Sequence, residues 1–187
     1  MGPRKREPFK VYQLKVTLVG SRPPIWRRIL VPSNITLAKL HDVLQAIMAW
    51  TNSHMHEFVK DRRSFGDSSM DVEVEDERKW RLDQLLTKPN DKMVYVYDFG
   101  DDWQHQVLLE KILEPEPGVR YPVLVAGKRA APPEDVGGIF GYAEFLDALA
   151  DPSHPMHEDY KDWVGDGFDP EAFDLKEVND LLEYLRR

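Results

Sequence analysis

The spacing of apolar residues changes once in the first 50 positions, and this change constrains the fold more than any other feature of the chain. Residues 11–18 and 25–31 are rich in β-branched and aromatic side chains and partly alternate with polar ones. They are separated by a short stretch that holds Gly20 and the pair Pro23-Pro24. Two such runs across a Gly/Pro turn predict a β-hairpin.

From residue 37 onward the apolar positions recur with the period of a helix. They are Leu37, Leu40, Leu44, Ile47 and Met48. Residues spaced in this way share one face of an α-helix, and Thr36 is a suitable N-cap for it. We therefore predict one amphipathic helix that ends near Trp50.

Strand patterns return after this helix. Residues 92–99 and 104–112 predict a second hairpin across Gly100-Asp101-Asp102. Residues 56–60 and 70–74 are shorter strand candidates on either side of a polar loop at 61–69. No Gly-rich turn joins a strand to a helix, which excludes a Rossmann or P-loop nucleotide site.

The last third of the chain reads as helical. One apolar stripe runs from Tyr142 to Leu149 and stops at Asp151-Pro152, and a second runs from Met156 to Val164 after Pro155. A final helix is predicted after Asp174, an N-cap residue with Glu177 three positions later. Its inward face is formed by Val178, Leu181, Leu182 and Leu185.

These patterns predict an α+β fold, with a mixed or antiparallel sheet rolled around one central helix (ββαββ-type) and a helical C-terminal third. We expect a flexible basic tail at residues 1–10 and a single domain at 11–187. Within it, 11–114 supply the sheet and helix, 115–133 a Pro-rich extended connection, and 134–187 an acidic helical part.

The charge is polarised along the chain. Residues 1–28 carry eight basic side chains and one acidic one, whereas residues 134–187 carry 15 acidic and four basic ones. Because the formal net charge is -8, the sequence disfavours nucleic acid as the partner, and a protein or small-molecule ligand is favoured. No apolar run is long enough for a membrane span or a signal peptide, so we expect a cytoplasmic protein without a membrane partner.

Three separated motifs resemble one known family. They are Tyr97-Asp98-Phe99-Gly100-Asp101-Asp102-Trp103-Gln104-His105, Pro132-Pro133-Glu134-Asp135-Val136-Gly137-Gly138 and Asp151-Pro152-Ser153-His154-Pro155-Met156-His157-Glu158. Together with Pro24-Ile25-Trp26-Arg27-Arg28 and Leu40-His41-Asp42, they are similar to the plasmid pRiA4b ORF-3-like proteins over roughly residues 10–185. The resemblance implies an α+β fold and a link to mobile elements, since some members are labelled transposon passenger proteins. It implies no established reaction.

The family often carries cysteine around its Pro-Pro-Glu-Asp motif, and this chain does not. Ala130, Ala131 and Val136 occupy that neighbourhood, and the whole chain contains no cysteine. Any thiolate nucleophile, thiolate metal site or disulfide is therefore excluded.

The second hairpin gathers candidate ligands for a divalent metal ion. Asp98, Asp101, Asp102 and His105 place three carboxylates and one imidazole around a turn, beside Trp103. The alternative is structural, because Asp and Gly suit the positive-φ positions of tight turns, and His105 would share a core face with Trp103.

Glu134 and Asp135 are the acids that most favour a functional role. The following Gly137-Gly138 permits close approach of a ligand or a tight turn into the helix that contains Tyr142. In the structural alternative, one of these acids stabilises the N-terminus of that helix.

Two further sets are candidates of lower specificity. His154 and His157, with Asp151, have a spacing compatible with a metal, but they lack the His-Glu-x-x-His pattern, and a histidine before Pro155 can instead cap a helix. Trp26, Arg27 and Arg28 could contact nucleic acid, although a buried Trp beside an Arg paired with the acidic C-terminal helices explains them better.

The sequence therefore favours a non-catalytic binding or interaction domain. The alternatives are a metal-dependent hydrolase that uses the Asp, Glu and His residues of the motifs, and a nucleic-acid accessory protein that uses the basic N-terminal region.

Overall fold

The computed structural model describes residues 9–69, 73–165 and 167–186. Its elements are, in chain order, β1 (Val11–Leu18), β2 (Trp26–Pro32), α1 (Leu37–Met48), β3 (His56–Lys60), β4 (Arg63–Gly66), β5 (Glu75–Asp76), the 3-10 turn η1 (Glu77–Lys79), α2 (Leu82–Leu85), β6 (Lys92–Tyr97), β7 (Trp103–Leu113), β8 (Val123–Lys128), α3 (Gly138–Ala150), α4 (His157–Val164), α5 (Leu175–Leu182) and the 3-10 turn η2 (Glu183–Leu185).

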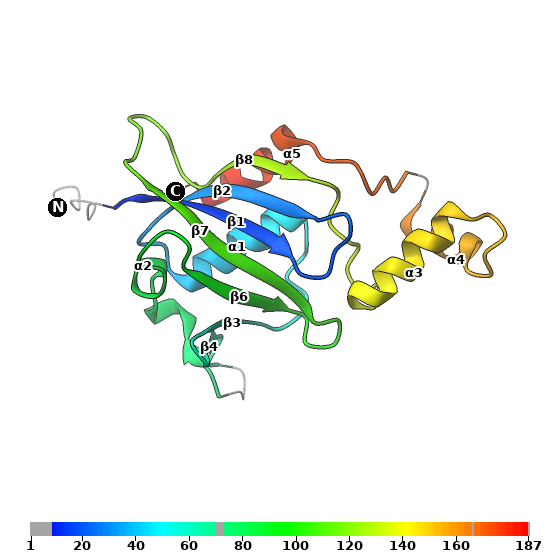
Figure 1. Ribbon diagram of the computed structural model, residues 1–187, viewed down its shortest axis with the longest axis horizontal. Helices are drawn as coiled ribbons and strands as arrows, with labels where there is room; N and C mark the ends of the chain where they lie inside the picture. Colours follow the sequence, from blue (N-terminus) through cyan, green and yellow to red (C-terminus); the bar gives the residue numbers. More distant parts are fainter. Residues whose placement is uncertain (1–8, 70–72, 166, 187) are drawn as a thin grey trace.

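Within the described residues, eight strands form one sheet in the order β5-β4-β3-β6-β7-β1-β2-β8. The pairs are antiparallel except for β4 with β5, which are parallel. Figure 1 shows α1 lying across one face of the sheet and α5 beside it, behind β2 and β8. The chain therefore has the α+β fold that its sequence predicts.

The central helix follows the predicted pattern. The Thr36 hydroxyl accepts a hydrogen bond from the Lys39 backbone N–H (3.4 Å), and the helix ends when Ala49 adopts the left-handed region at φ 53°. All five apolar residues of the predicted stripe are buried. Because they cover one face of α1, this helix forms the core together with the inward side chains of the sheet.

Both predicted hairpins are confirmed. β1 pairs with β2, and β6 pairs with β7 from Lys92 opposite Leu108 to Tyr97 opposite Trp103. The second hairpin places residues 98–102 at one end of the sheet, close to the segment that precedes α3 (Figure 1).

Two segments differ from the sequence expectation. The predicted loop at 61–69 contains β4, a strand with one large apolar residue, Phe65, which pairs with β3. The predicted connection at 115–133 contains β8, which adds to the free edge of β2. In both cases the neighbouring strand supplies the backbone hydrogen bonds, so a segment whose own sequence predicts a strand only weakly can still form one.

Parts of two other expectations lie outside the described residues. Of the strand predicted at 70–74, residues 70–72 lie outside them, and Glu73 and Val74 are not in a strand. Most of the predicted basic tail, residues 1–8, also lies outside them.

The helical third divides into two parts. α5 begins after Asp174, whose carboxylate accepts hydrogen bonds from the N–H groups of Lys176 and Glu177, as predicted. It packs against α1 and β8, whereas α3 and α4 pair with each other beyond the end of the sheet (Figure 1). Among the described residues, no helix is long and apolar enough to cross a membrane.

Candidate metal centre

The turn of the second hairpin is built by aspartate. Asp98 and Asp102 both have positive φ values, 58° and 53°. One carboxylate oxygen of Asp98, Oδ1, accepts hydrogen bonds from the N–H groups of Gly100 (2.9 Å) and Asp101 (3.3 Å). This side-chain turn is the structural role that the sequence offers as an alternative for these residues. It leaves the other oxygen of Asp98 free of the turn.

The diglycine segment is docked onto this hairpin. Asp101 Oδ2 accepts a hydrogen bond from the Gly137 N–H (3.1 Å), at the N-cap position of α3. A Cβ atom on Gly138 would lie 2.3 Å from the Asp101 carbonyl oxygen. Close approach of the two backbones therefore requires glycine at position 138. Asp101, rather than Glu134 or Asp135, is the acid that meets the start of this helix.

Glu134 fixes the same segment from its other side. Its Oε2 accepts hydrogen bonds from the Thr51 N–H (3.0 Å) and hydroxyl (2.7 Å), and its Oε1 accepts one from the Tyr97 hydroxyl (2.7 Å). The Tyr97 oxygen in turn accepts the Ser53 N–H (3.0 Å). Burial and then the bond to Glu134 raise the pKa of Tyr97. Glu134 thus joins the loop after α1, the end of β6 and the diglycine segment.

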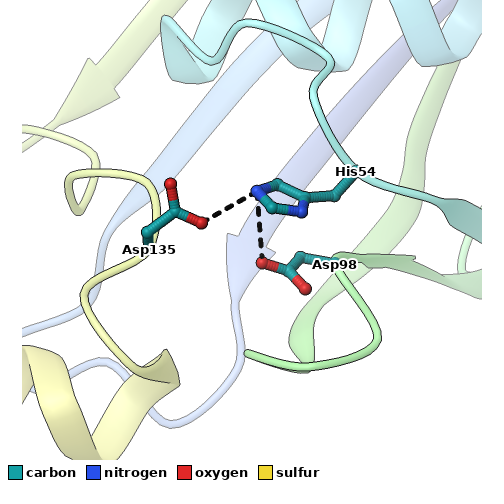
Figure 2. Close-up of side chains that lie close together, drawn as sticks. All are labelled: His54, Asp98 and Asp135. Atoms are coloured by element: carbon teal, nitrogen blue, oxygen red, sulfur yellow. Dashed lines mark ion pairs between the residues drawn. The ribbon is translucent and has the colours of Figure 1, made fainter.

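Three ligand-type side chains meet where these segments converge. His54 Nε2 lies 2.9 Å from Asp135 Oδ1 and 3.6 Å from Asp98 Oδ2. Figure 2 shows the imidazole between the two carboxylates, with Asp135 on the loop that leads into α3 and Asp98 just after the end of β6. One ligand atom from each residue lies within 4.8 Å of the other two. The side chains are 30%, 12% and 69% exposed for His54, Asp98 and Asp135, so the group is open on the side of Asp135.

The nitrogen at the centre of this group is unusual. His54 Nε2 is closed off by the protein, yet it has no hydrogen-bond partner in the described part of the chain. Its two carboxylate neighbours are within ion-pair distance, but neither contact is a hydrogen bond: Asp98 Oδ2 is too far away at 3.6 Å, and Asp135 Oδ1 is near enough at 2.9 Å but poorly aligned. A shared cation satisfies one imidazole nitrogen and two carboxylate oxygens without requiring a hydrogen-bond angle.

A second histidine cluster borders the first. His41 Nδ1 lies 2.8 Å from the Tyr95 hydroxyl, and His56 Nε2 lies 2.8 Å from Glu77 Oε2. The two imidazole rings stack with centroids 3.5 Å apart and planes inclined by 5°. Burial, and then the neighbouring His56, lowers the pKa of His41 to about 4. A polar pocket of about 410 Å³ is lined by both histidines and by His54, so it connects the two clusters.

The ligand group expected at the hairpin does not form one site. His105 is buried (1% exposed) between Trp50 and Tyr95, where burial lowers its pKa to about 4. Trp103 is buried beside it, and Asp102 pairs with the Gln104 side chain at the surface. The hairpin therefore contributes Asp98 to the cluster and Asp101 to its support.

The histidines between α3 and α4 make local bonds. Asp151 Oδ1 accepts from the N–H and hydroxyl of Ser153, and these bonds lower its pKa. His154 Nδ1 accepts the Met156 N–H, and His157 Nδ1 lies 2.8 Å from the Ala148 carbonyl oxygen. Met156 is the N-cap of α4 and no side chain caps this helix, so His154 does not have the capping role that the sequence offers as its alternative. In the described chain these residues do not gather into a metal-ligand group. Tyr142 lies in the core, stacked on Phe145.

The basic residues of β2 are engaged inside the protein. Trp26 and Arg28 share one face and Arg27 the other, as predicted. However, Trp26 is only half-buried, and Arg28 makes a two-bond ion pair with Glu110 of β7 rather than with the C-terminal helices. Arg27 is the buried residue of the three. The expected arrangement of a buried Trp beside an Arg paired with the acidic helices is therefore wrong.

Sequence reasoning missed His54 and the His41–His56 pair. His54 follows α1 in a segment without a metal motif, and its partners lie 44 and 81 positions away in the chain. The available signal was the pair of imidazoles at positions 54 and 56, where a strand begins. Only the pairing of β3 with β6, which sets His56 opposite Tyr97, brings this segment to Asp98.

Comparison with known proteins supports the resemblance. Residues 10–177 match the family described as "Plasmid pRiA4b ORF-3-like protein". "Uncharacterized protein y4hQ" of Sinorhizobium fredii (strain NBRC 101917 / NGR234) is 38% identical over 179 residues, covering 94% of this chain and 92% of that protein. The crystal structure of a protein of unknown function, MM3350 from Methanosarcina mazei Go1, matches with a TM-score of 0.84 and 44% identity, covering 93% of this chain and 99% of that one.

Proposed function

The chain belongs to the plasmid pRiA4b ORF-3-like protein family, and we propose that it is a binding domain that holds a divalent metal ion through His54, Asp98 and Asp135. The observation that carries this proposal is His54 Nε2, a shielded nitrogen that faces two carboxylate oxygens without a hydrogen bond. Asp98 and Asp135 are among the candidate residues of the sequence analysis, whereas His54 is not.

The mixed ligand set favours a particular class of ion. One imidazole nitrogen with two carboxylate oxygens suits Zn²⁺ or Mn²⁺ better than Mg²⁺, which prefers all-oxygen octahedral sites. Three protein ligands leave coordination positions for water or for an anionic group of a bound molecule. Asp135 is the most exposed of the three, so an external ligand reaches the ion from its side.

Supporting contacts hold the ligands in place. Asp98 is fixed by its turn bonds to Gly100 and Asp101, and Asp135 follows Glu134, which is held by Thr51 and Tyr97. Hydrogen bonds that orient metal ligands from outside the coordination sphere are a general feature of metal sites.

Calorimetric titration of metal-free protein without a histidine tag tests the proposal. We expect one Zn²⁺ or Mn²⁺ ion per chain, weaker Mg²⁺ binding, and affinity reduced at least about tenfold in His54→Gln and in Asp135→Asn. Asp102→Asn is the matched control, because it removes a carboxylate from the same hairpin but outside the cluster. Absence of binding, or equal binding by all four proteins, contradicts the proposal.

Metal-dependent hydrolysis is the second candidate, and the shared pocket is the observation that favours it. His54 lines the 410 Å³ pocket together with His56, whose Nε2 is held by Glu77. A histidine oriented by a carboxylate is the usual arrangement of a general base. Turnover of chromogenic phosphate and carboxylate esters by metal-loaded protein, lost in His56→Asn while metal affinity is retained, would distinguish the hydrolase from a binding domain.

A further inference from the structure

A second concavity is lined in part by Trp50 and Glu134, and it has a different chemistry. It has a volume of about 730 Å³ and lies between the end of α1, residues 130–134, α4 and α5. Its lining is mainly apolar and includes Trp50, Trp163, Phe168, Phe173 and Leu181. Cavities of this size and composition are typical of small-molecule sites.

A buried guanidinium lies in this lining. Arg27 is 3% exposed and lies under the ring of Phe173, whose centroid is 4.6 Å from Arg27 Cζ. The Phe173 ring in turn lies against Gly127, where a Cβ atom would come within 2.5 Å of it. Arg27 is therefore held between β8, α1 and the segment before α5.

Only part of the hydrogen-bonding capacity of Arg27 is used. Its Nε donates to the Ile47 carbonyl (3.0 Å), and its Nη1 donates to the Trp26 and Lys128 carbonyls (both 3.0 Å). A guanidinium has five N–H donors, so the two on Nη2 remain without a partner in the described chain. Arg27 is one of the residues that line the concavity, so its side chain forms part of the wall.

The positive charge of Arg27 is also unpaired in the described chain. Burial alone lowers its pKa to about 10, without an opposing effect from a carboxylate. Of the acids in the lining, Glu134 is bound by Thr51 and Tyr97, and Asp174 caps α5. Glu177 is exposed to solvent. The buried charge of this concavity is therefore positive.

We propose that this concavity binds a small carboxylic acid with an apolar body, its carboxylate accepting hydrogen bonds from Arg27 Nη2 and its apolar part lying against Trp50, Phe173 and Leu181. Charge complementarity carries this assignment, because a buried guanidinium with free donors favours an anionic head group. The apolar lining then selects for the rest of the molecule. This inference does not depend on the metal centre.

Calorimetric titration of metal-free protein with octanoate and with 1-octanol tests the site. The two ligands share one alkyl chain length and differ in the charged head group. We expect one octanoate per chain, bound at least tenfold more tightly than octanol, and an acid preference that disappears in Arg27→Gln.

A second variant keeps the test decisive if Arg27→Gln does not fold. Leu181 is 43% exposed and lines the concavity, so Leu181→Trp fills space without disturbing the core. We expect this variant to lose octanoate binding at least tenfold. Failure of the protein to bind octanoate, equal affinity for octanoate and octanol, or unchanged binding by Leu181→Trp overturns the proposal.

Discussion

Replacing Gly138 by alanine should move Asp98 and Asp135, two ligands of the candidate metal centre, away from each other. The new Cβ would lie 2.3 Å from the Asp101 carbonyl oxygen, whereas ordinary contact begins at 3.4 Å. One backbone must therefore move by about 1.1 Å relative to the other, whereas metal sites tolerate only about 0.2 Å. Since Asp98 and Asp135 lie on the two backbones concerned, their carboxylates would move apart.

The cost to stability has two parts. Gly138 has φ +68°, and an alanine in this left-handed region costs about 1–2 kcal/mol. Overpacking against the Asp101 backbone adds about 1–3 kcal/mol. For a chain of this size, each kcal/mol lowers Tm by about 2–4 °C.

Gly137→Ala is the matched control for this variant. Gly137 also has positive φ (+95°), but its Cβ would lie 3.5 Å from the nearest atom, Gly141 Cα. It therefore carries the backbone strain without the clash. We expect thermal unfolding of metal-free protein to give a lower Tm for Gly138→Ala than for Gly137→Ala, by about 2–12 °C. Equal Tm values would refute the argument that position 138 is fixed by close approach, whether or not a metal binds.

The remaining predictions concern stability. Burial lowers the folded-state pKa of both His41 and His105 to about 4, from an ordinary 6.5, so the unfolded chain takes up protons first as pH falls. The free energy of unfolding should thus decrease from about pH 6.5 to about pH 4, by about 2 kcal/mol per histidine at pH 5. Urea unfolding across this range should show a shallower decrease for His105→Leu, and an unchanged slope would contradict this reasoning. Asn179 of α5 accepts the Leu124 N–H (3.0 Å) and donates to the Leu124 carbonyl (2.8 Å) at the sheet edge. Asn179→Ala should therefore cost about 1–3 kcal/mol in chemical denaturation, whereas Asp180→Ala, which removes only an exposed ion pair with Lys176 on the same helix, should cost about 0.5 kcal/mol or less.

The elements with strong local patterns could be predicted from the sequence. The stripe from Leu37 to Met48, the N-caps Thr36 and Asp174, and the hairpins 11–31 and 92–112 are encoded by residues close in the chain. By contrast, β4 and β8 exist because neighbouring strands offer free edges, and their own sequences, Arg-Ser-Phe-Gly and Val-Leu-Val-Ala-Gly-Lys, are short and do not alternate clearly between apolar and polar residues.

The candidate metal centre was predictable in part. The sequence singles out Asp98, Asp135 and the diglycine, because acids beside flexible backbone are uncommon outside turns and sites. It does not indicate that Asp101 meets Gly137, or that Asp98 divides its two oxygens between a turn and His54. Such a division of roles depends on orientation, which residue type alone does not specify.

Composition, periodicity and motifs are enough to establish the α+β class, the family, the absence of thiolate chemistry and the order of the main elements. Which distant side chains meet depends on the tertiary structure. His54 reaches Asp98 through the pairing of β3 with β6, and Asp135 reaches both through the docking of the diglycine on Asp101. These contacts join positions up to 81 residues apart, so local patterns carry no information about them, and sheet register and backbone packing fix them instead.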